Sequence, residues 1–233
     1  MEQPTYGIVG RGRVAIHLAR YLDLESRPFS IWHRGMPCAP ADAIGDRTII
    51  LLAISDDALE PFLAENPALK RKTLVHFSGS RTLDGATGLH PLMTFGPEPY
   101  ELETYQSIPF VSERGGKTFG DIFPGFLNPG FEIDPGQKPL YHALCVMAGN
   151  FPTLLWAKVF GDFEQGLGLP HDVLRPYLER TLENTFESGG KALTGPLARS
   201  DTGTVRRNLE ALGEDSYAAV YRAFARSHGM QEI

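Results

Sequence analysis

The residues best suited to chemistry form a glycine-rich turn near the N-terminus. The pattern Gly10-x-Gly12-x-x-Ala15 directly follows the apolar run Tyr6–Val9 and opens a segment with helical spacing. In such a turn Gly10 permits the tight bend, Gly12 lets the backbone approach a pyrophosphate, and Ala15 allows the helix to pack closely on the strand. The phosphates would bind the free amides and the positive end of the helix. The spacing therefore predicts a nucleotide site, with a purely structural turn as the alternative.

An arginine at the end of the second predicted strand indicates which nicotinamide cofactor would bind. Arg34 stands 22 residues after Gly12, and no acid occupies that place. An acid there holds the adenosine ribose hydroxyl of NAD, whereas a cation accommodates the 2′-phosphate of NADP. We therefore predict that Arg34 binds NADP(H), helped by Arg11 or Arg13, because a guanidinium pairs with phosphate bidentately. The alternative is a solvated arginine at a strand end.

Further cofactor contacts are expected at the start of the first helix and at the ends of the third and fourth strands. They are Val14, Ala53, Ile54, Ser55 and Ser78. Ser55 or Asp56 is equally suited to cap the helix that follows. Ser78 could contact the nicotinamide ribose, although turn chemistry explains this serine equally well.

Four side chains could deliver the proton that a carbonyl reduction needs. Hydride transfer leaves a developing alkoxide, which requires a positioned acid or hydrogen-bond donor. The candidates are Lys138, His142, His90 and Asn150. Lys138 and His142 share one helix face, whereas Asn150 lies about 18 Å from Lys138 along a straight helix. Lys138 and Asn150 therefore cannot hold the same small carbonyl, and for each candidate a structural role is the alternative.

The elements that must position these residues alternate strands and helices from Thr5 to about Ile133. Short apolar runs predict strands over Tyr6–Val9, Phe29–His33, Thr48–Ile54, Thr73–Phe77, a run ending near His90, and Ile108–Ser112. Apolar residues at helical spacing predict a helix over Arg13–Leu24. Strands that are apolar throughout are buried on both faces. We therefore predict an α/β fold, a Rossmann-type doubly wound parallel sheet that binds ligands at the carboxyl ends of its strands.

The remainder of the chain reads as helical. Repeated prolines and glycines over residues 123–139 predict a boundary, with an NADP-binding domain over 1–136 and a smaller all-helical substrate and dimerisation domain over 137–233. Helices are predicted over Leu140–Phe163, Leu169–Ser188, Thr202–Leu212 and Asp215–Ser227. Gly149 and Pro152 should interrupt the first of them. Arg199 is a candidate ligand for a substrate carboxylate across a dimer interface, with a structural ion pair as the alternative, and Asp201 should cap the helix that begins at Thr202.

Composition excludes several classes of function. The 233 residues carry a formal net charge of −6, which argues against a partner that is nucleic acid or an acidic membrane surface. Only Cys38 and Cys145 are present, so neither a disulfide framework nor a cysteine zinc site is expected. No apolar run approaches the about 20 residues of a membrane span, and the N-terminus lacks a signal-peptide pattern. We expect a cytoplasmic globular protein without a metal, whose partner is a small-molecule substrate.

Several longer segments carry a family resemblance. They are residues 10–15, 51–57, 76–79, 90–95, 138–143, 149–151, 181–184 and 193–201. Together, over residues 5 to about 225, they resemble the Rossmann-like NADP oxidoreductases with an uncharacterised helical C-terminal domain, in the superfamily of 6-phosphogluconate dehydrogenase, pyrroline-5-carboxylate reductase and ketopantoate reductase. The sequence departs from that pattern at Ser200, where a glycine is common.

The resemblance implies an NADP-dependent reductase of a small oxo acid or imine that works as a homodimer packed through its C-terminal helices. It also implies that Lys138 is the acid and His142 its partner, while His90 and Asn150 lie near the nicotinamide. The leading hypothesis is NADPH-dependent reduction of a 2-oxo acid, with ketopantoate as the first choice. The alternatives are a non-catalytic NADP-binding sensor and an imine or deazaflavin-linked reductase on the same scaffold.

Overall fold

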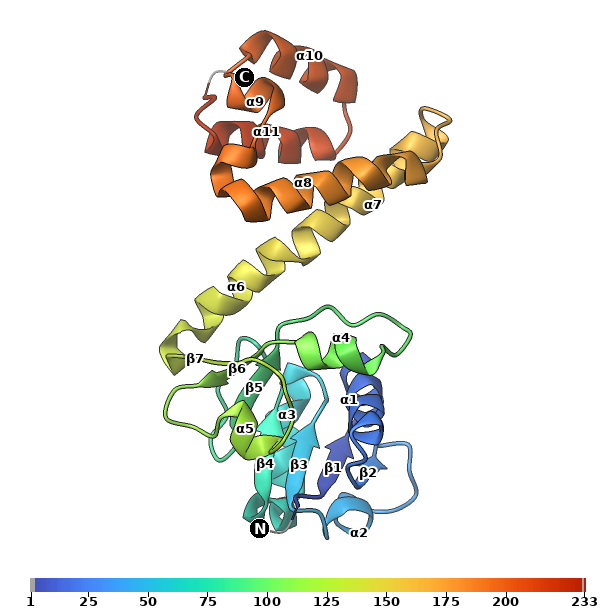
Figure 1. Ribbon diagram of the computed structural model, residues 1–233, viewed down its shortest axis with the longest axis vertical. Helices are drawn as coiled ribbons and strands as arrows, with labels where there is room; N and C mark the ends of the chain where they lie inside the picture. Colours follow the sequence, from blue (N-terminus) through green and yellow to red (C-terminus); the bar gives the residue numbers. More distant parts are fainter. Residues whose placement is uncertain (1–2, 232) are drawn as a thin grey trace. The chain divides into compact units, whose positions relative to one another are not determined.

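A seven-stranded sheet forms the centre of the N-terminal part of the chain (Figure 1). The computed structural model describes residues 3–231 and 233. The strands are β1 (Tyr6–Val9), β2 (Phe29–Trp32), β3 (Ile49–Leu52), β4 (Thr73–His76), β5 (Thr87–Pro91), β6 (Phe110–Glu113) and β7 (Gly130–Ile133). Their order is β2-β1-β3-β4-β5-β6-β7, and every neighbouring pair is parallel except the antiparallel β5 and β6. The predicted Rossmann-type α/β fold is confirmed.

Helices cover the sheet and form the rest of the chain. They are α1 (Arg13–Leu24), α2 (Pro40–Ile44), α3 (Asp56–Glu65), α4 (Leu102–Ser107), α5 (Phe119–Ile122), α6 (Lys138–Ala148), α7 (Asn150–Gln165), α8 (Arg175–Ser188), α9 (Gly195–Ala198), α10 (Thr202–Leu212) and α11 (Tyr217–Ser227). Short 3₁₀ turns lie at η1 (Pro67–Arg71), η2 (Pro135–Gln137), η3 (His171–Leu174) and η4 (Gly189–Ala192). The predicted bounds of α1 and α10 are confirmed.

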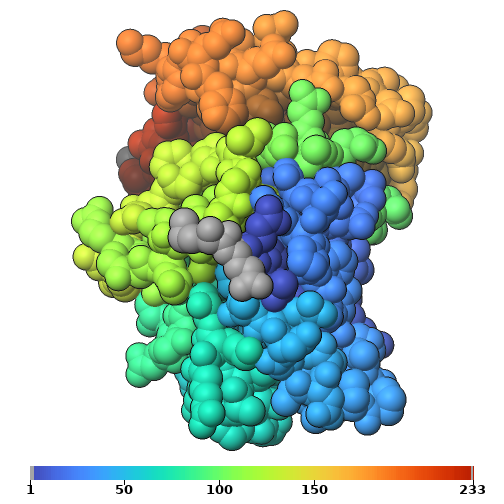
Figure 2. Space-filling model, turned by 60° about the horizontal axis from the view of Figure 1, so that its bottom comes forward, coloured from blue at the N-terminus to red at the C-terminus, as the bar shows by residue number. Residues whose placement is uncertain are grey.

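Two apolar cores lie on opposite faces of the sheet because side chains alternate along each strand. Ile49 and Leu51 of β3 join the core that includes α1, whereas Ile50 and Leu52 join the core that includes α3. All four residues of β3 are buried. Figure 2 shows the domain from the end where β1 to β5 begin, with the segments around α2 and η1 next to each other. Ligands of such sheets bind at the opposite end, where these strands finish.

Sequence reasoning missed the short helices α2, α5 and α9 and the strand β7. Strand β7 pairs in parallel with β6, with Phe110 opposite Gly130 and Glu113 opposite Ile133. Pro129 stands just before the strand, and its carbonyl oxygen accepts a hydrogen bond of 2.8 Å from the Phe110 amide. The prolines and glycines around residues 123–139 that predicted only a linker therefore flank a short edge strand, a position that tolerates proline.

The chain divides into two compact units, Met1–Leu155 and Trp156–Ile233. The predicted boundary at residue 136 falls directly before α6, whereas the division by compactness falls within α7. Helix α6 belongs to the first unit because its first residue, Lys138, is buried against Glu113 at the end of β6.

The second unit has a small apolar core of its own. This core contains Val205, Leu209, Ala218, Ala225 and Met230. Asp201 caps α10 as predicted, because its Oδ1 accepts a hydrogen bond of 2.9 Å from the Thr204 amide, and that hydrogen bond lowers the pKa of the Asp201 carboxyl. Ser200, which stands where relatives often have glycine, adopts a φ of +53°, a conformation that glycine enters more readily.

Helices α6 and α7 are separated by a single residue, Gly149. The Thr153 amide and hydroxyl both donate to the Gly149 carbonyl, at 3.2 and 2.8 Å, so the interruption predicted from Gly149 and Pro152 stays local. By length and composition alone, the segment Pro135–Gln165, with a mean hydropathy of 1.3 in its most apolar window, could cross a membrane. The expectation that no segment passes this test was wrong, because the helix continues through Gly149.

Candidate active site

A cavity of about 660 Å³ lies at the carboxyl ends of β1 to β4. All ten residues predicted to contact a cofactor line it, namely Gly10, Arg11, Gly12, Arg13, Val14, Arg34, Ala53, Ile54, Ser55 and Ser78. Sequence reasoning missed the apolar wall that α3 contributes through Ala58, Pro61 and Phe62. Their spacing of three and four residues along one helix face is the signal that could have revealed it.

The turn after β1 contains one glycine that the fold requires, Gly10, and one that leaves open space for a phosphate, Gly12. Gly10 adopts a φ of +129°, and a Cβ there would lie 2.2 Å from the Ala53 carbonyl oxygen, so only glycine fits. Gly12 is the N-cap of α1, and a Cβ there would meet nothing within 4 Å. The first-turn amides of α1 are therefore open toward the cavity, as an anion site requires.

Three arginines surround this open turn. Arg11, Arg13 and Arg34 are exposed and line the cavity, and none of them forms an ion pair within residues 3–231 and 233. Their guanidinium groups are thus available to a phosphate-bearing ligand. The residues present fit a dinucleotide with an additional phosphate.

At the end of β3, the helix-capping alternative for Ser55 is not realised. Ser55 occupies the N-cap of α3, but its side chain makes no capping hydrogen bond. Asp56 instead accepts hydrogen bonds from the Ser78 hydroxyl at 2.7 Å and from the Ser80 hydroxyl at 3.3 Å. These bonds fix the loop after β4 against the start of α3.

Immediately after Ser78, the chain passes beneath two histidines. A Cβ at Gly79 would lie 2.6 Å from the His142 ring and 3.0 Å from Nε2 of His90, so a larger residue would displace both rings. The centroids of these two rings are 6.2 Å apart. The structure therefore brings two predicted catalytic residues to the edge of the cofactor cavity.

Tyr141, which sequence reasoning did not select, lies beside these two histidines. We call His90, Tyr141, His142 and Lys138 the His90 cluster. The Tyr141 hydroxyl lies 2.8 Å from Nδ1 of His90, and the two rings meet edge to face. Tyr141 is three residues after Lys138 and therefore lies on the same face of α6 as Lys138 and His142. That spacing is the signal in the sequence that could have indicated it.

Lys138, the fourth member of the cluster, is buried and already paired. Its Nζ lies 2.7 Å from Glu113 Oε1, and the two side chains are only 4% and 16% exposed. A Cβ at Gly88 would lie 2.4 Å from both of these atoms, so β5 needs glycine at the point where the pair crosses it. Glu113 was not predicted as a site residue, because its partner is 25 residues away in sequence.

Two histidines in this region, His90 and His76, favour their neutral form. Burial, and secondly the charges of His142 and Lys138, lower the pKa of His90 to about 4. Burial and Lys138 likewise lower the pKa of His76, at the end of β4, to about 4. Neither ring nitrogen of His76 has a hydrogen-bond partner within the described residues.

Two predicted residues are not part of this cluster. Asn150 is exposed at the start of α7, 12 residues after Lys138. Arg199 is exposed at the end of α9 in the second unit and has no ion pair within the described chain, so the alternative of a structural ion pair is not realised there. The substrate role of Arg199 stays a prediction.

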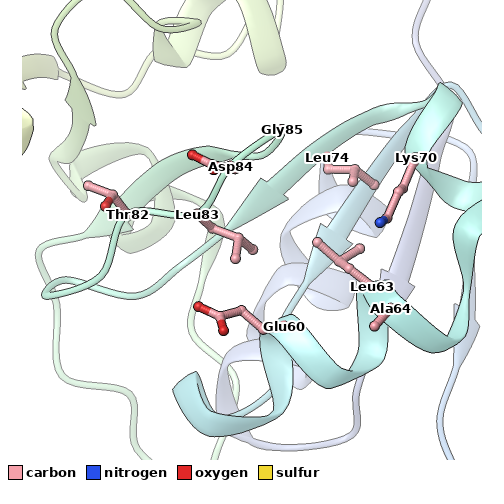
Figure 3. A pocket seen from close by; sticks show the side chains of 9 residues that line it. All are labelled: Glu60, Leu63, Ala64, Lys70, Leu74, Thr82, Leu83, Asp84 and Gly85. Carbon is pink, nitrogen blue, oxygen red and sulfur yellow. The ribbon is translucent and has the colours of Figure 1, made fainter.

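A second cavity, of about 550 Å³, lies on the other side of α3 (Figure 3). Leu63 and Leu74 form its floor, and the charged side chains of Glu60, Lys70 and Asp84 stand at its rim. It lacks the glycine turn and the arginines of the first cavity, so it offers no comparable phosphate site. Within the described residues, no three histidine, cysteine or acidic side chains are grouped to hold a metal ion.

Comparison with known proteins agrees with this geometry. Residues 113–228 match the family model described as "Domain of unknown function (DUF2520)". No protein in a search of curated sequences matches the chain.

Solved structures match over nearly the whole length. A candidate NADP oxidoreductase from Bacteroides fragilis is 21% identical, with a TM-score of 0.75 and 97% of each chain covered. An imine reductase from Streptomyces aurantiacus is 16% identical, with a TM-score of 0.63 over 95% of this chain and 93% of that one. A Plasmodium falciparum pyrroline carboxylate reductase with NADP bound is 13% identical, with a TM-score of 0.61 over 97% and 100%. At these identities the likeness establishes a shared fold.

Proposed function

We propose that this chain, which has a Rossmann-like oxidoreductase fold and matches the DUF2520 model over residues 113–228, is an NADPH-dependent reductase of a small 2-oxo acid, with ketopantoate as the first substrate to test. One observation carries the proposal. A single cavity at the carboxyl ends of the strands combines an open glycine turn with three unpaired arginines, and the His90 cluster lies at its edge. The NADP-dependent names of the structural neighbours support it.

Different residues along the cavity bind different parts of the cofactor. The turn from Gly10 to Val14 holds the pyrophosphate through its amides, and Arg34 holds the 2′-phosphate. Ser78 lies at the nicotinamide end, next to the His90 cluster. NADPH supplies a hydride when it is bound. The protein's own task is then to place the carbonyl and to give the oxygen a proton.

The cofactor assignment is tested by calorimetry with NADPH and NADH. We expect wild-type protein to bind NADPH more tightly, and Arg34→Ala to bring the two dissociation constants together, because a lost charge-assisted bond costs roughly 1.5–3 kcal/mol. Lys70→Ala, which removes an exposed cation from the second cavity, is the matched control and should leave the ratio unchanged. Equal wild-type affinities for NADPH and NADH would defeat the role of Arg34.

The reaction is tested by following NADPH oxidation with ketopantoate and other 2-oxo acids. Turnover with any of them supports a reductase of this class. NADPH binding without turnover across 2-oxo acids and cyclic imines would favour the sensor alternative over the enzyme.

The likeness to a solved imine reductase suggests an imine as a second candidate substrate. A higher kcat/KM for cyclic imines than for 2-oxo acids would select this candidate, and the reverse order would reject it.

We also infer that the protein is a homodimer packed through its C-terminal helices. Leu140, Leu144, Met147 and Phe151 are 48–61% exposed and recur at intervals of four, three and four residues, which forms one apolar stripe. Light scattering should therefore give twice the chain mass for wild type and the chain mass for Leu144→Glu. A monomeric wild-type protein would contradict the dimer, and detergent-dependent extraction would instead indicate that Pro135–Gln165 enters a membrane.

A further inference from the structure

We infer that Tyr141 is a positioning residue that holds the His90 ring with its Nε2–H toward the cofactor cavity, so that a neutral imidazole, and not Lys138, delivers the proton. This inference rests on the proposed function and deepens it. It concerns His90 of β5 and Tyr141 of α6, which are 51 positions apart in the sequence.

The geometry leaves one nitrogen of His90 available to a substrate. Nδ1 is 2.8 Å from the Tyr141 hydroxyl and is therefore occupied. Nε2 points to the backbone of Gly79, where a Cβ would approach it to 3.0 Å. Ser78, the residue before Gly79, lines the cofactor cavity. Nε2 therefore lies beside the Ser78 end of that cavity.

The hydroxyl of Tyr141 decides which nitrogen carries the ring proton. Burial raises the pKa of Tyr141, so the hydroxyl carries its proton in the resting protein. The phenol is a good donor, and an unprotonated imidazole nitrogen is the strongest neutral acceptor within its reach. The Cys145 thiol beside this hydroxyl also raises the pKa of Tyr141, but its sulfur is only a weak acceptor and does not compete with the imidazole nitrogen. Tyr141 therefore donates to Nδ1, which leaves the proton of the neutral ring on Nε2.

The neighbouring charges keep the His90 ring neutral, and an ion pair with Glu113 holds Lys138, the competing acid. His142 and Lys138 oppose a positive charge on His90, and Asp56 favours one more weakly. Lys138 is 3% exposed, and its ammonium is held by Glu113 at 2.7 Å. An ammonium fixed in that pair cannot follow the substrate oxygen, whereas the Nε2–H at the cavity edge can donate to it.

The proton transfer balances without a further reagent. Reduction of the carbonyl leaves an alkoxide oxygen, which takes the Nε2 proton while Nδ1 takes the hydroxyl proton of Tyr141. A water molecule then gives a proton to Nε2 as Nδ1 returns its proton to the phenolate, and the hydroxide that remains passes to the solvent. The solvent is the net source of the proton, and the ring never carries two protons.

The test is ¹⁵N NMR of the full chain labelled at histidine, without cofactor. We expect the His90 signals of wild type at neutral pH to show a protonated Nε2 and a bare Nδ1. Tyr141→Phe should mix the two tautomers, lower kcat at least about tenfold and change the NADPH dissociation constant less than about twofold. Tyr177→Phe, at a 69% exposed position, is the control and should change none of these quantities.

Two results would overturn the inference. One is a wild-type His90 with its proton on Nδ1, and the other is a folded Tyr141→Phe protein whose tautomer and kcat equal those of wild type. If Tyr141→Phe does not fold, the wild-type spectrum alone decides. Because that spectrum needs neither cofactor nor turnover, failure of the proposed function, seen as absent NADPH binding, is distinguished from failure of this inference.

Discussion

At the scale of single residues, glycine is present at positions 10 and 12 of one turn for two different physical reasons. Gly10 is required by the fold, because its φ of +129° and the Ala53 carbonyl oxygen exclude any side chain. Gly12 adopts an extended conformation with open space around it, so the protein alone does not require glycine there. What a side chain at Gly12 would obstruct is a ligand on the amides of α1.

This difference predicts opposite outcomes for two substitutions of equal size. Gly10→Ala should lower the free energy of unfolding by more than about 1 kcal/mol, because of backbone strain and a direct clash. Gly12→Ala should unfold like wild type in urea but lose NADPH affinity in calorimetry. A Gly12→Ala protein that binds NADPH normally would show that the cofactor does not approach this turn.

At the scale of elements, helix α6 depends on the buried pair at its first residue. Lys138 and Glu113 tie the start of the helix to the end of β6, and Gly88 gives the pair room to cross β5. A buried ion pair adds little net stability over apolar residues, yet removing one partner leaves an uncompensated charge. The same turn of α6 carries Tyr141 and His142, so this pair also sets the geometry of the cluster.

We therefore predict strong coupling between the two partners in a double-mutant cycle. Lys138→Met and Glu113→Gln should each lower the unfolding free energy, by about 3–5 kcal/mol for a fully buried pair. The double variant should lose much less than the sum, because neither charge is then left alone. Urea unfolding measures all three, and additive losses would contradict a buried, mutually dependent pair.

At the scale of the whole molecule, the neutral histidines make stability depend on pH. His76 and His90 have a folded-state pKa of about 4, below the ordinary 6.5. Between these values the unfolded chain binds protons on both residues and the folded chain does not. The unfolding free energy therefore falls as the pH falls through this window, by up to about 1.4 kcal/mol per pH unit for each histidine.

This linkage predicts the behaviour of one variant. His76→Leu should be at least as stable as wild type at neutral pH, because both buried ring nitrogens lack a partner within the described residues. Its loss of stability between about pH 6.5 and 4 should be roughly half that of wild type. Urea titrations at several pH values measure both quantities, and an unchanged slope would mean that His76 is protonated in the folded state.

Much of the fold and of the cofactor site was predictable because the relevant signals are local. The φ of Gly10 and the apolar stripe of α1 depend on neighbours within a few residues, and both were read correctly. Strand β7 was not, because its flanking prolines and glycines are also typical of linkers. Ser55 was a reasonable cap by type, yet the structure gives Asp56 the hydrogen bonds instead.

The sequence by itself determined the Rossmann-type sheet, its glycine turn and the helical C-terminal part, because spacing along one chain encodes turns, strands and helix faces. Only the tertiary structure decided that Glu113 neutralises Lys138 and that Tyr141 engages His90. Those contacts join residues 25 and 51 positions apart. They exist because the strand order and the docking of α6 place them together, and no spacing within one element specifies such a meeting.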